Sequence, residues 1–120
     1  DEATRDEPDP RQRFVEAFAL GVAMSREHPL LTRLLATEPD TLLPVLTVHA
    51  EPVQEAGRAL LAPLLRDAGA PADERTEVAA ELLVRVAISL VLTPGGVVET
   101  DTPEAARAFA RSHLLPLTGL

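Results

Sequence analysis

Residues 78–92, VAAELLVRVAISLVL, are apolar at all but three positions. The exceptions, Glu81, Arg85 and Ser89, are spaced four residues apart and so share one narrow stripe of a helix. A surface helix needs an apolar arc of little more than about 100°, yet this arc covers most of the circumference. The pattern therefore predicts a helix that is buried on two separate faces. With 15 residues and a central arginine, the segment is too short and too charged for a membrane span of about 20 apolar residues.

The boundaries of this helix and of the one after it follow from turn and capping residues. The helix is predicted over residues 72–92, because the turn sequence TPGG comes directly after it. Thr102 then offers a capping hydroxyl, Pro103 suits the first helical position, and Glu104 places an acid near the positive helix end. The last helix is predicted to run from there to Pro116, which closes it.

Four more helices are predicted upstream from apolar periodicity and from proline or glycine stops. Asp40 is expected to cap the third, and Gly69 to end the fourth. Pro63 lies inside the fourth helix, so we expect that helix either to kink or to split in two. Together with the last two, the chain is predicted to be an all-α bundle of about six helices, without a convincing strand. The four upstream helices are placed at residues 11–28, 30–38, 40–49 and 52–68.

The composition fits one globular domain that does not bind nucleic acid by itself. The chain has 120 residues, of which 46% are hydrophobic and 25% charged, as in folded domains. Its net charge of −8 would repel a polyanion, so DNA binding by this chain alone is not expected. Residues 1–10 are acidic and proline-rich, and we expect a flexible lead-in there, followed by the helical domain over residues 11–120.

The use of particular residue types indicates a source and a location. All 11 basic residues are arginine, which suggests the codon bias of a high-GC bacterium. The chain has no cysteine and no signal peptide at its start, which is compatible with a cytoplasmic protein.

No arrangement of residues predicts catalysis, a cofactor or a metal site, so an enzyme is not expected. His28 precedes a proline at a helix junction and is interpreted as a cap or surface residue. His113 is interpreted as a half-buried interface histidine, with a pH-sensitive dimer contact as the alternative. His49 ends a leucine-rich helix, where it is either a polar anchor in an apolar cavity or a histidine satisfied at a helix end.

Three segments resemble a known family in their order along the chain and in their amino-acid sequences. They are HPLLTRLLATEPDTLLPVLT (28–47), ELLVRVAISLVLTPGG (81–96) and TPEAARAFARSHLLPL (102–117). They look like the C-terminal domain of the tetracycline-repressor-like (TetR) regulators, and the resemblance spans roughly residues 11–118. It implies that the last two helices pair with their copies in a second subunit as a four-helix bundle, and that the first four helices enclose an apolar effector cavity.

The resemblance also implies roles for particular residues and for a domain outside this sequence. A helix-turn-helix domain is expected before Asp1, and DNA would be contacted only through it. The implied partners are a second copy of the chain and an unknown apolar small molecule, with no membrane. The candidate ligand-binding residues are Phe18, Val22, Leu46, His49 and Val53. The candidate dimer-interface residues are Leu82, Val86, Leu90, Ala106, Phe109, Ala110 and His113.

Two rival functions stay open at this point. One is a helical protein–protein interaction module that binds no small molecule, which a monomer in solution or a filled interior would favour. The other is a small enzyme in which His49 works with Glu51 or Asp40 as acid and base.

Overall fold

The computed structural model describes residues 7–120, in which all regular structure is helical. The last three segments follow one another without a break and form one rod, so the predicted six-helix, all-α architecture is confirmed. Residues 1–6 of the predicted lead-in lie outside the described residues. The elements are α1 (Pro10–Glu27), α2 (Pro29–Thr37), α3 (Pro39–Leu46), α4 (Glu51–Asp67), α5 (Glu74–Leu92), α6 (Pro103–Phe109), the π-helical turn η2 (Ala110–Leu114) and α7 (Leu115–Thr118).

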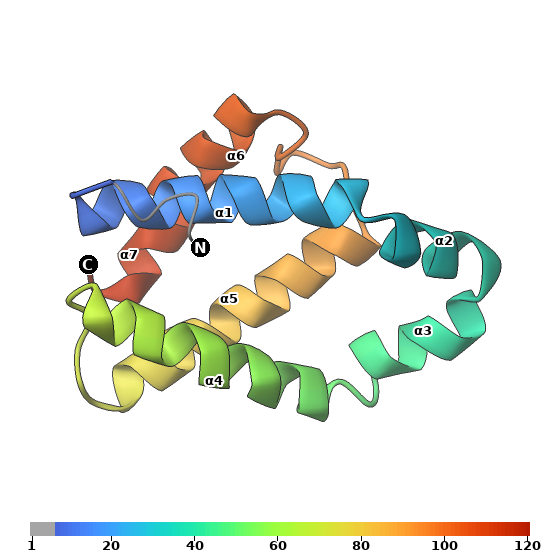
Figure 1. Ribbon diagram of the computed structural model, residues 1–120, viewed down its shortest axis with the longest axis horizontal. Helices are drawn as coiled ribbons and strands as arrows, with labels where there is room; N and C mark the ends of the chain where they lie inside the picture. The colour runs from blue at the N-terminus through green and yellow to red at the C-terminus, as the bar shows by residue number, and fades with distance from the viewer. Residues whose placement is uncertain (1–6) are drawn as a thin grey trace.

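The antiparallel pair α4–α5 is the most closely packed part of the molecule (Figure 1). Gly57 allows the close approach, because a Cβ there would overlap with Cγ2 of Val84. Two ion pairs join the same helices, Arg58–Glu81 at 2.8 Å and Arg66–Glu77 at 3.3 Å. α4 is a single helix that continues through Pro63, so it does not split.

α1 lies apart from α4, and it crosses and packs against the last rod (Figure 1). Asp9 caps α1 by accepting a hydrogen bond from the amide of Arg11 at 3.0 Å, and Pro10 occupies the first helical position. The core lies where α1, α4, α5 and the last rod meet. Its buried members are Val15, Ala62, Leu65, Ala70, Ala80, Leu83, Ala110, Leu114 and Leu115.

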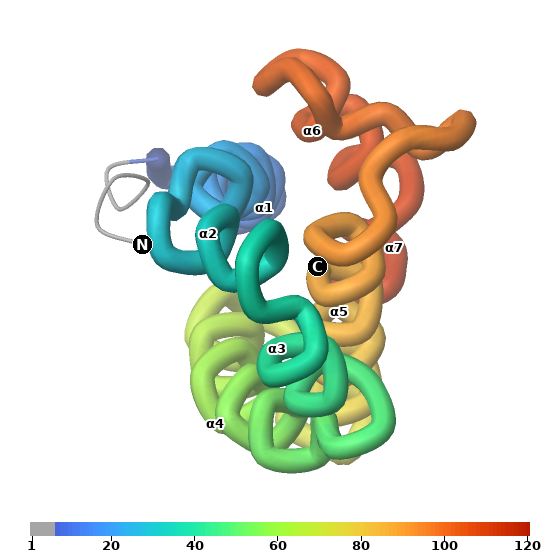
Figure 2. Tube along the Cα trace, turned by 90° about the vertical axis from the view of Figure 1, so that its right-hand side faces the viewer, coloured from blue at the N-terminus to red at the C-terminus, as the bar shows by residue number. Residues whose placement is uncertain are grey.

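α2 and α3 form an arm (residues 29–46) that connects the end of α1 to the beginning of α4 (Figure 1). In Figure 2 the arm lies nearest the viewer, in front of the other helices. Neither of its helices buries a residue, although half of the arm's 18 residues are leucine, valine or alanine. The arm therefore adds little to the core.

Three predicted boundaries are wrong in detail. Asp40 is not the cap of α3, because Pro39 already occupies the first helical position and Asp40 falls inside the first turn. The same helix ends at Leu46 and not near His49. Pro116 does not close the last rod, which continues to Thr118 and ends at Gly119 with φ of 77°.

The last rod begins as predicted and passes Pro116 with a change of helix type. Thr102 accepts a hydrogen bond from the amide of Ala105 at 3.1 Å, which confirms the predicted cap. A π-helical turn then precedes Pro116. In a regular α-helix the ring of Pro116 would crowd the carbonyl of Ser112, and the wider turn lies where this conflict would arise.

Candidate ligand-binding cavity

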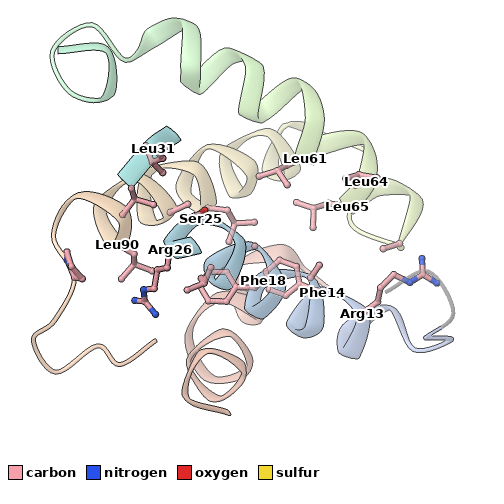
Figure 3. A pocket seen from close by; sticks show the side chains of 18 of the residues that line it. Arg13, Phe14, Phe18, Ser25, Arg26, Leu31, Leu61, Leu64, Leu65 and Leu90 are labelled. Carbon is pink, nitrogen blue, oxygen red and sulfur yellow. The ribbon is translucent and has the colours of Figure 1, made fainter. Parts of the chain in front are cut away.

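A cavity of about 890 Å³ lies between α1, α4, α5 and α2 (Figure 3). This volume is within the range of about 300–1,000 Å³ that is typical of small-molecule sites. Most of the residues that line it are apolar. The lining residues are Pro10, Arg13, Phe14, Ala17, Phe18, Gly21, Val22, Ser25, Arg26, Leu31, Thr32, Leu35, Ala36, Leu61, Leu64, Leu65, Asp67, Ala68, Leu83, Ala87, Leu90, Val91, Pro94 and Leu120.

One face of α1 forms a continuous wall of this cavity. Its lining residues recur at spacings of three and four from Pro10 to Arg26, which is the period of a single helical stripe. Sixteen helical steps of 1.5 Å make this wall about 24 Å long. Gly21 lies on it, and a Cβ added there would meet no atom within 4 Å, so the cavity is open beside Gly21.

The opposite walls come from different helices at the two ends. Figure 3 shows Leu61, Leu64 and Leu65 of α4 toward the Arg13 end, whereas Leu31 of α2 and Leu90 of α5 lie toward the Arg26 end. The α4–α5 pair thus supplies a packed wall along the cavity, and the arm closes part of one end.

The polar lining groups gather at the ends of the cavity. At one end, Arg13 donates from Nε and Nη2 to the backbone oxygen of Glu7, at 3.2 and 3.1 Å, and Asp67 lines the same end. At the other end, Arg26 donates to the backbone oxygen of Thr100, and its Nη2 donates to Oγ1 of Thr100 at 2.6 Å. These bonds tie the end of α1 to the loop before α6.

Aromatic rings connect the cavity wall to the last rod. The ring centroids of Phe18 and Phe109 are 5.9 Å apart, and those of Phe109 and His113 are 5.5 Å apart. Phe18 lines the cavity, while His113 is exposed on the outer side of the last rod. Tilted contacts at such distances are favourable for aromatic pairs.

The structure places the five candidate ligand-binding residues in two groups. Phe18 and Val22 line the cavity on α1. Leu46, His49 and Val53 lie where α3 passes into α4, and they do not line it; His49 is exposed in the connecting turn. A ligand role for any of the five stays a prediction.

The candidate dimer-interface residues are divided by burial. Ala106 and Ala110 are 1% and 0% exposed within the single chain, where α6 packs on α1. Phe109 is half-buried against Phe18. The residues that reach the surface, fully or in part, are Leu82, Val86, Leu90 and His113.

Most of the cavity lining was not predicted, although the α1 stripe contained a signal for it. Phe14, Phe18 and Val22 show the helical spacing, but the same spacing is expected of ordinary core residues. Gly21 was the informative residue, because a glycine in the middle of an apolar stripe leaves space where a side chain would otherwise pack. Nothing in the sequence indicated that Arg13, Ser25 and Arg26 line a cavity, because the positions of its ends depend on how the helices are arranged.

Two polar groups outside the cavity, the imidazole of His28 and the carboxyl of Glu81, have structural explanations. Nδ1 of His28 accepts a hydrogen bond from the amide of Leu31 at 3.3 Å, as expected of a cap. The hydrogen bond from Arg85 lowers the pKa of the Glu81 carboxyl, and Arg58 acts in the same direction. Among residues 7–120, no group of three or more acidic or histidine side chains could hold a metal ion.

Comparison with known proteins places this architecture in a family. Residues 9–111 match the family described as the bacterial tetracyclin repressor, C-terminal domain, which covers well over half of the chain. The chain belongs to this family. Tetracyclin repressor C-terminal domains are parts of transcriptional regulators, so the resemblance seen in the sequence is confirmed. No curated protein and no solved structure matches the chain.

One further property of this tetracyclin repressor C-terminal domain concerns membranes. Across the described range 7–120, no helix is both long and apolar enough to cross a bilayer.

Proposed function

We propose that this chain is the effector-binding and dimerisation domain of a bacterial transcriptional regulator, and that its effector is a largely apolar small molecule. The observation that carries the proposal is the cavity of about 890 Å³, lined mainly by apolar side chains, inside a tetracyclin repressor C-terminal domain. The family supports a role in regulation and not in catalysis. Such a regulator works in the cytoplasm, where it meets DNA.

The proposed dimer is a homodimer that pairs α5 and the last rod with their copies. Val78 and Leu82 of α5 are 54% and 40% exposed, and Leu117 of α7 is 42% exposed, so apolar surface is available on both elements. A second copy would bury this surface, as the wide apolar arc of α5 requires. The net charge of −8 disfavours contact between this chain and a polyanion. DNA would instead be contacted through a helix-turn-helix domain N-terminal to this chain.

Two measurements on the purified chain test the proposal. Light scattering coupled to size exclusion should give a mass of twice 12.8 kDa, and Leu82→Glu should convert it to the monomer. Titration with the fluorescent amphipathic anion 1-anilinonaphthalene-8-sulfonate should show one saturable site per chain. Gly21→Phe should weaken that site at least tenfold, because the new ring enters the space beside Gly21.

Met24→Phe is the matched control for the cavity. Met24 lies on the same helix, is 62% exposed and does not line the cavity, so its variant should bind the dye like the parent chain. Equal dye binding by the parent and Gly21→Phe would place the dye elsewhere and contradict effector binding. A concentration-independent monomer that binds no dye would favour the protein–protein interaction module instead.

A further inference from the structure

The shape of the cavity restricts the ligand that would fill it. The cavity follows one face of α1 for about 24 Å. It is therefore long enough for an extended ligand that lies along this helix. The α1 wall alternates bulky and small side chains, such as Phe18 beside Ala17 and Gly21. A flexible unbranched chain can follow so uneven a wall more closely than a rigid fused-ring system.

The middle of the cavity offers nothing that a polar ligand group could bind. Between Phe14 and Val22 the α1 wall is wholly apolar, and the facing residues include Leu61, Leu65 and Leu83. A polar group placed there would lose its hydrogen bonds to water without gaining new ones, which costs free energy. The polar part of a ligand therefore belongs at an end.

The two ends differ in charge. At one end Arg13 and Asp67 carry opposite charges. At the other end Arg26 is the one charged residue of the described lining, and the preceding residue, Ser25, also lines the cavity there. The hydrogen bonds of Arg26 go to uncharged oxygens of Thr100, and within residues 7–120 no carboxylate forms an ion pair with it. Arg26 is also exposed, so an anionic group there would stay partly hydrated.

We propose that the ligand is an amphipathic anion with an unbranched alkyl chain, a long-chain carboxylate in the simplest case, whose head group binds at Arg26 and whose chain runs along α1 toward Arg13. This inference rests on the proposed effector-binding function and specifies its ligand. Distances from Arg26 along the axis of α1 therefore correspond to lengths of the bound alkyl chain. Gly21 lies about 7.5 Å, and Ala17 about 13.5 Å, from Arg26 along the helix axis.

The test measures, by calorimetry, the affinities of octanoate, dodecanoate and hexadecanoate, each below its micellar concentration. The parent chain should bind hexadecanoate at least tenfold more tightly than octanoate. Gly21→Phe should abolish that preference, because its ring blocks the chain close to the head group. Ala17→Phe should shorten the preferred chain to an intermediate length, and Met24→Phe should change nothing.

Head-group recognition is tested with hexadecanol, which has the same chain and no charge. The parent chain should prefer hexadecanoate at least tenfold, and this preference should fall toward unity in Arg26→Gln but persist in Arg13→Gln. Circular dichroism checks that each variant is folded.

The outcomes separate this inference from the proposed function. If the anilinonaphthalenesulfonate dye binds in the cavity while the carboxylates show no dependence on chain length, the ligand class is wrong and effector binding stands. If Ala17→Phe restricts chain length more than Gly21→Phe, the head group binds at the Arg13 end and the proposed orientation is overturned. If neither the dye nor any carboxylate binds, both proposals fail.

Discussion

The α4–α5 pair and the arm of α2 and α3 both contribute to the wall of the cavity, the arm through α2, but they are held in place very differently. The pair buries seven residues, approaches closely at Gly57 and is joined by ion pairs. The arm buries none and is linked to the rest mainly through the end of α1. Stability is thus concentrated on one wall of the cavity. Regions with few buried contacts open most readily. The arm is therefore the part of the cavity wall that a bound ligand would stabilise against opening.

The largest effect is expected from Leu83→Ala in α5, which removes a side chain that is 7% exposed and belongs to the core. Leucine-to-alanine changes in cores cost about 2–5 kcal/mol, and since Leu83 also borders the cavity we expect about 2–3 kcal/mol. Urea unfolding followed by circular dichroism measures this. Leu83→Met is the control and should lose under about 1.5 kcal/mol, because it conserves volume. A loss below 1 kcal/mol for Leu83→Ala would contradict a scaffold role for the pair.

Two glycines in helix interiors should respond oppositely to alanine. Gly21→Ala fills open space and should stabilise the fold by about 0.5–1 kcal/mol through helix propensity alone. Gly57→Ala brings a Cβ into overlap with the stiff, buried side chain of Val84, and we expect a loss of about 1–2 kcal/mol. Thermal and urea unfolding of both variants compare the changes directly. Stabilisation by Gly57→Ala would contradict close packing of α4 against α5 at this position.

The acid stability of the pair should depend on Glu81. Its pKa is lowered in the fold by the hydrogen bond from Arg85 and by Arg58, so its carboxylate favours the folded state above the usual glutamate range, about pH 4.3. That contribution is lost as the pH falls through the lowered pKa. The stability difference between the parent and Glu81→Gln, from urea unfolding, should therefore shrink from pH 7 to pH 3. In 1 M salt it should already be small at pH 7, because exposed charges are screened.

The smallest effect is expected in the arm. Leu43→Ala changes a side chain that is 38% exposed in a helix without buried residues, so it should cost under about 0.5 kcal/mol. Hydrogen exchange should show that amides of residues 29–46 exchange faster than those of α5, and that a bound ligand slows them. Equal protection of the arm and α5 in the free chain would remove the contrast between the two walls.

The course of the chain was predictable where local chemistry decides it. Thr102 with Pro103 located the start of the last rod, and the proline before Leu30 separated α1 from α2, because capping and proline geometry act within one turn. The prediction that Pro116 ends the last helix was wrong. The helix accommodates Pro116 with a π turn, and no residue pattern in the sequence indicated that turn.

The site was less predictable because apolar periodicity identifies a buried face without identifying its partner. Ala106 and Ala110 suit close helix packing, and the structure uses them against α1 within one chain, whereas the sequence allowed a second subunit equally well. The leucines of the arm had the pattern of a core helix and yet remain unburied. The distance between walls, which decides between core and cavity, depends on how all the helices are arranged.

The contact of Phe18 with Phe109, and of Phe109 with His113, means that the cavity and the outer surface of the last rod are separated there by a single phenylalanine ring. A ligand that shifts Phe18 acts on a side chain already in contact with the one that touches His113. The imidazole resonances of His113 therefore offer an intrinsic reporter of occupancy, read from the surface without a label. If the last rod forms the dimer contact, a structural change at the cavity would reach the second subunit through two aromatic contacts.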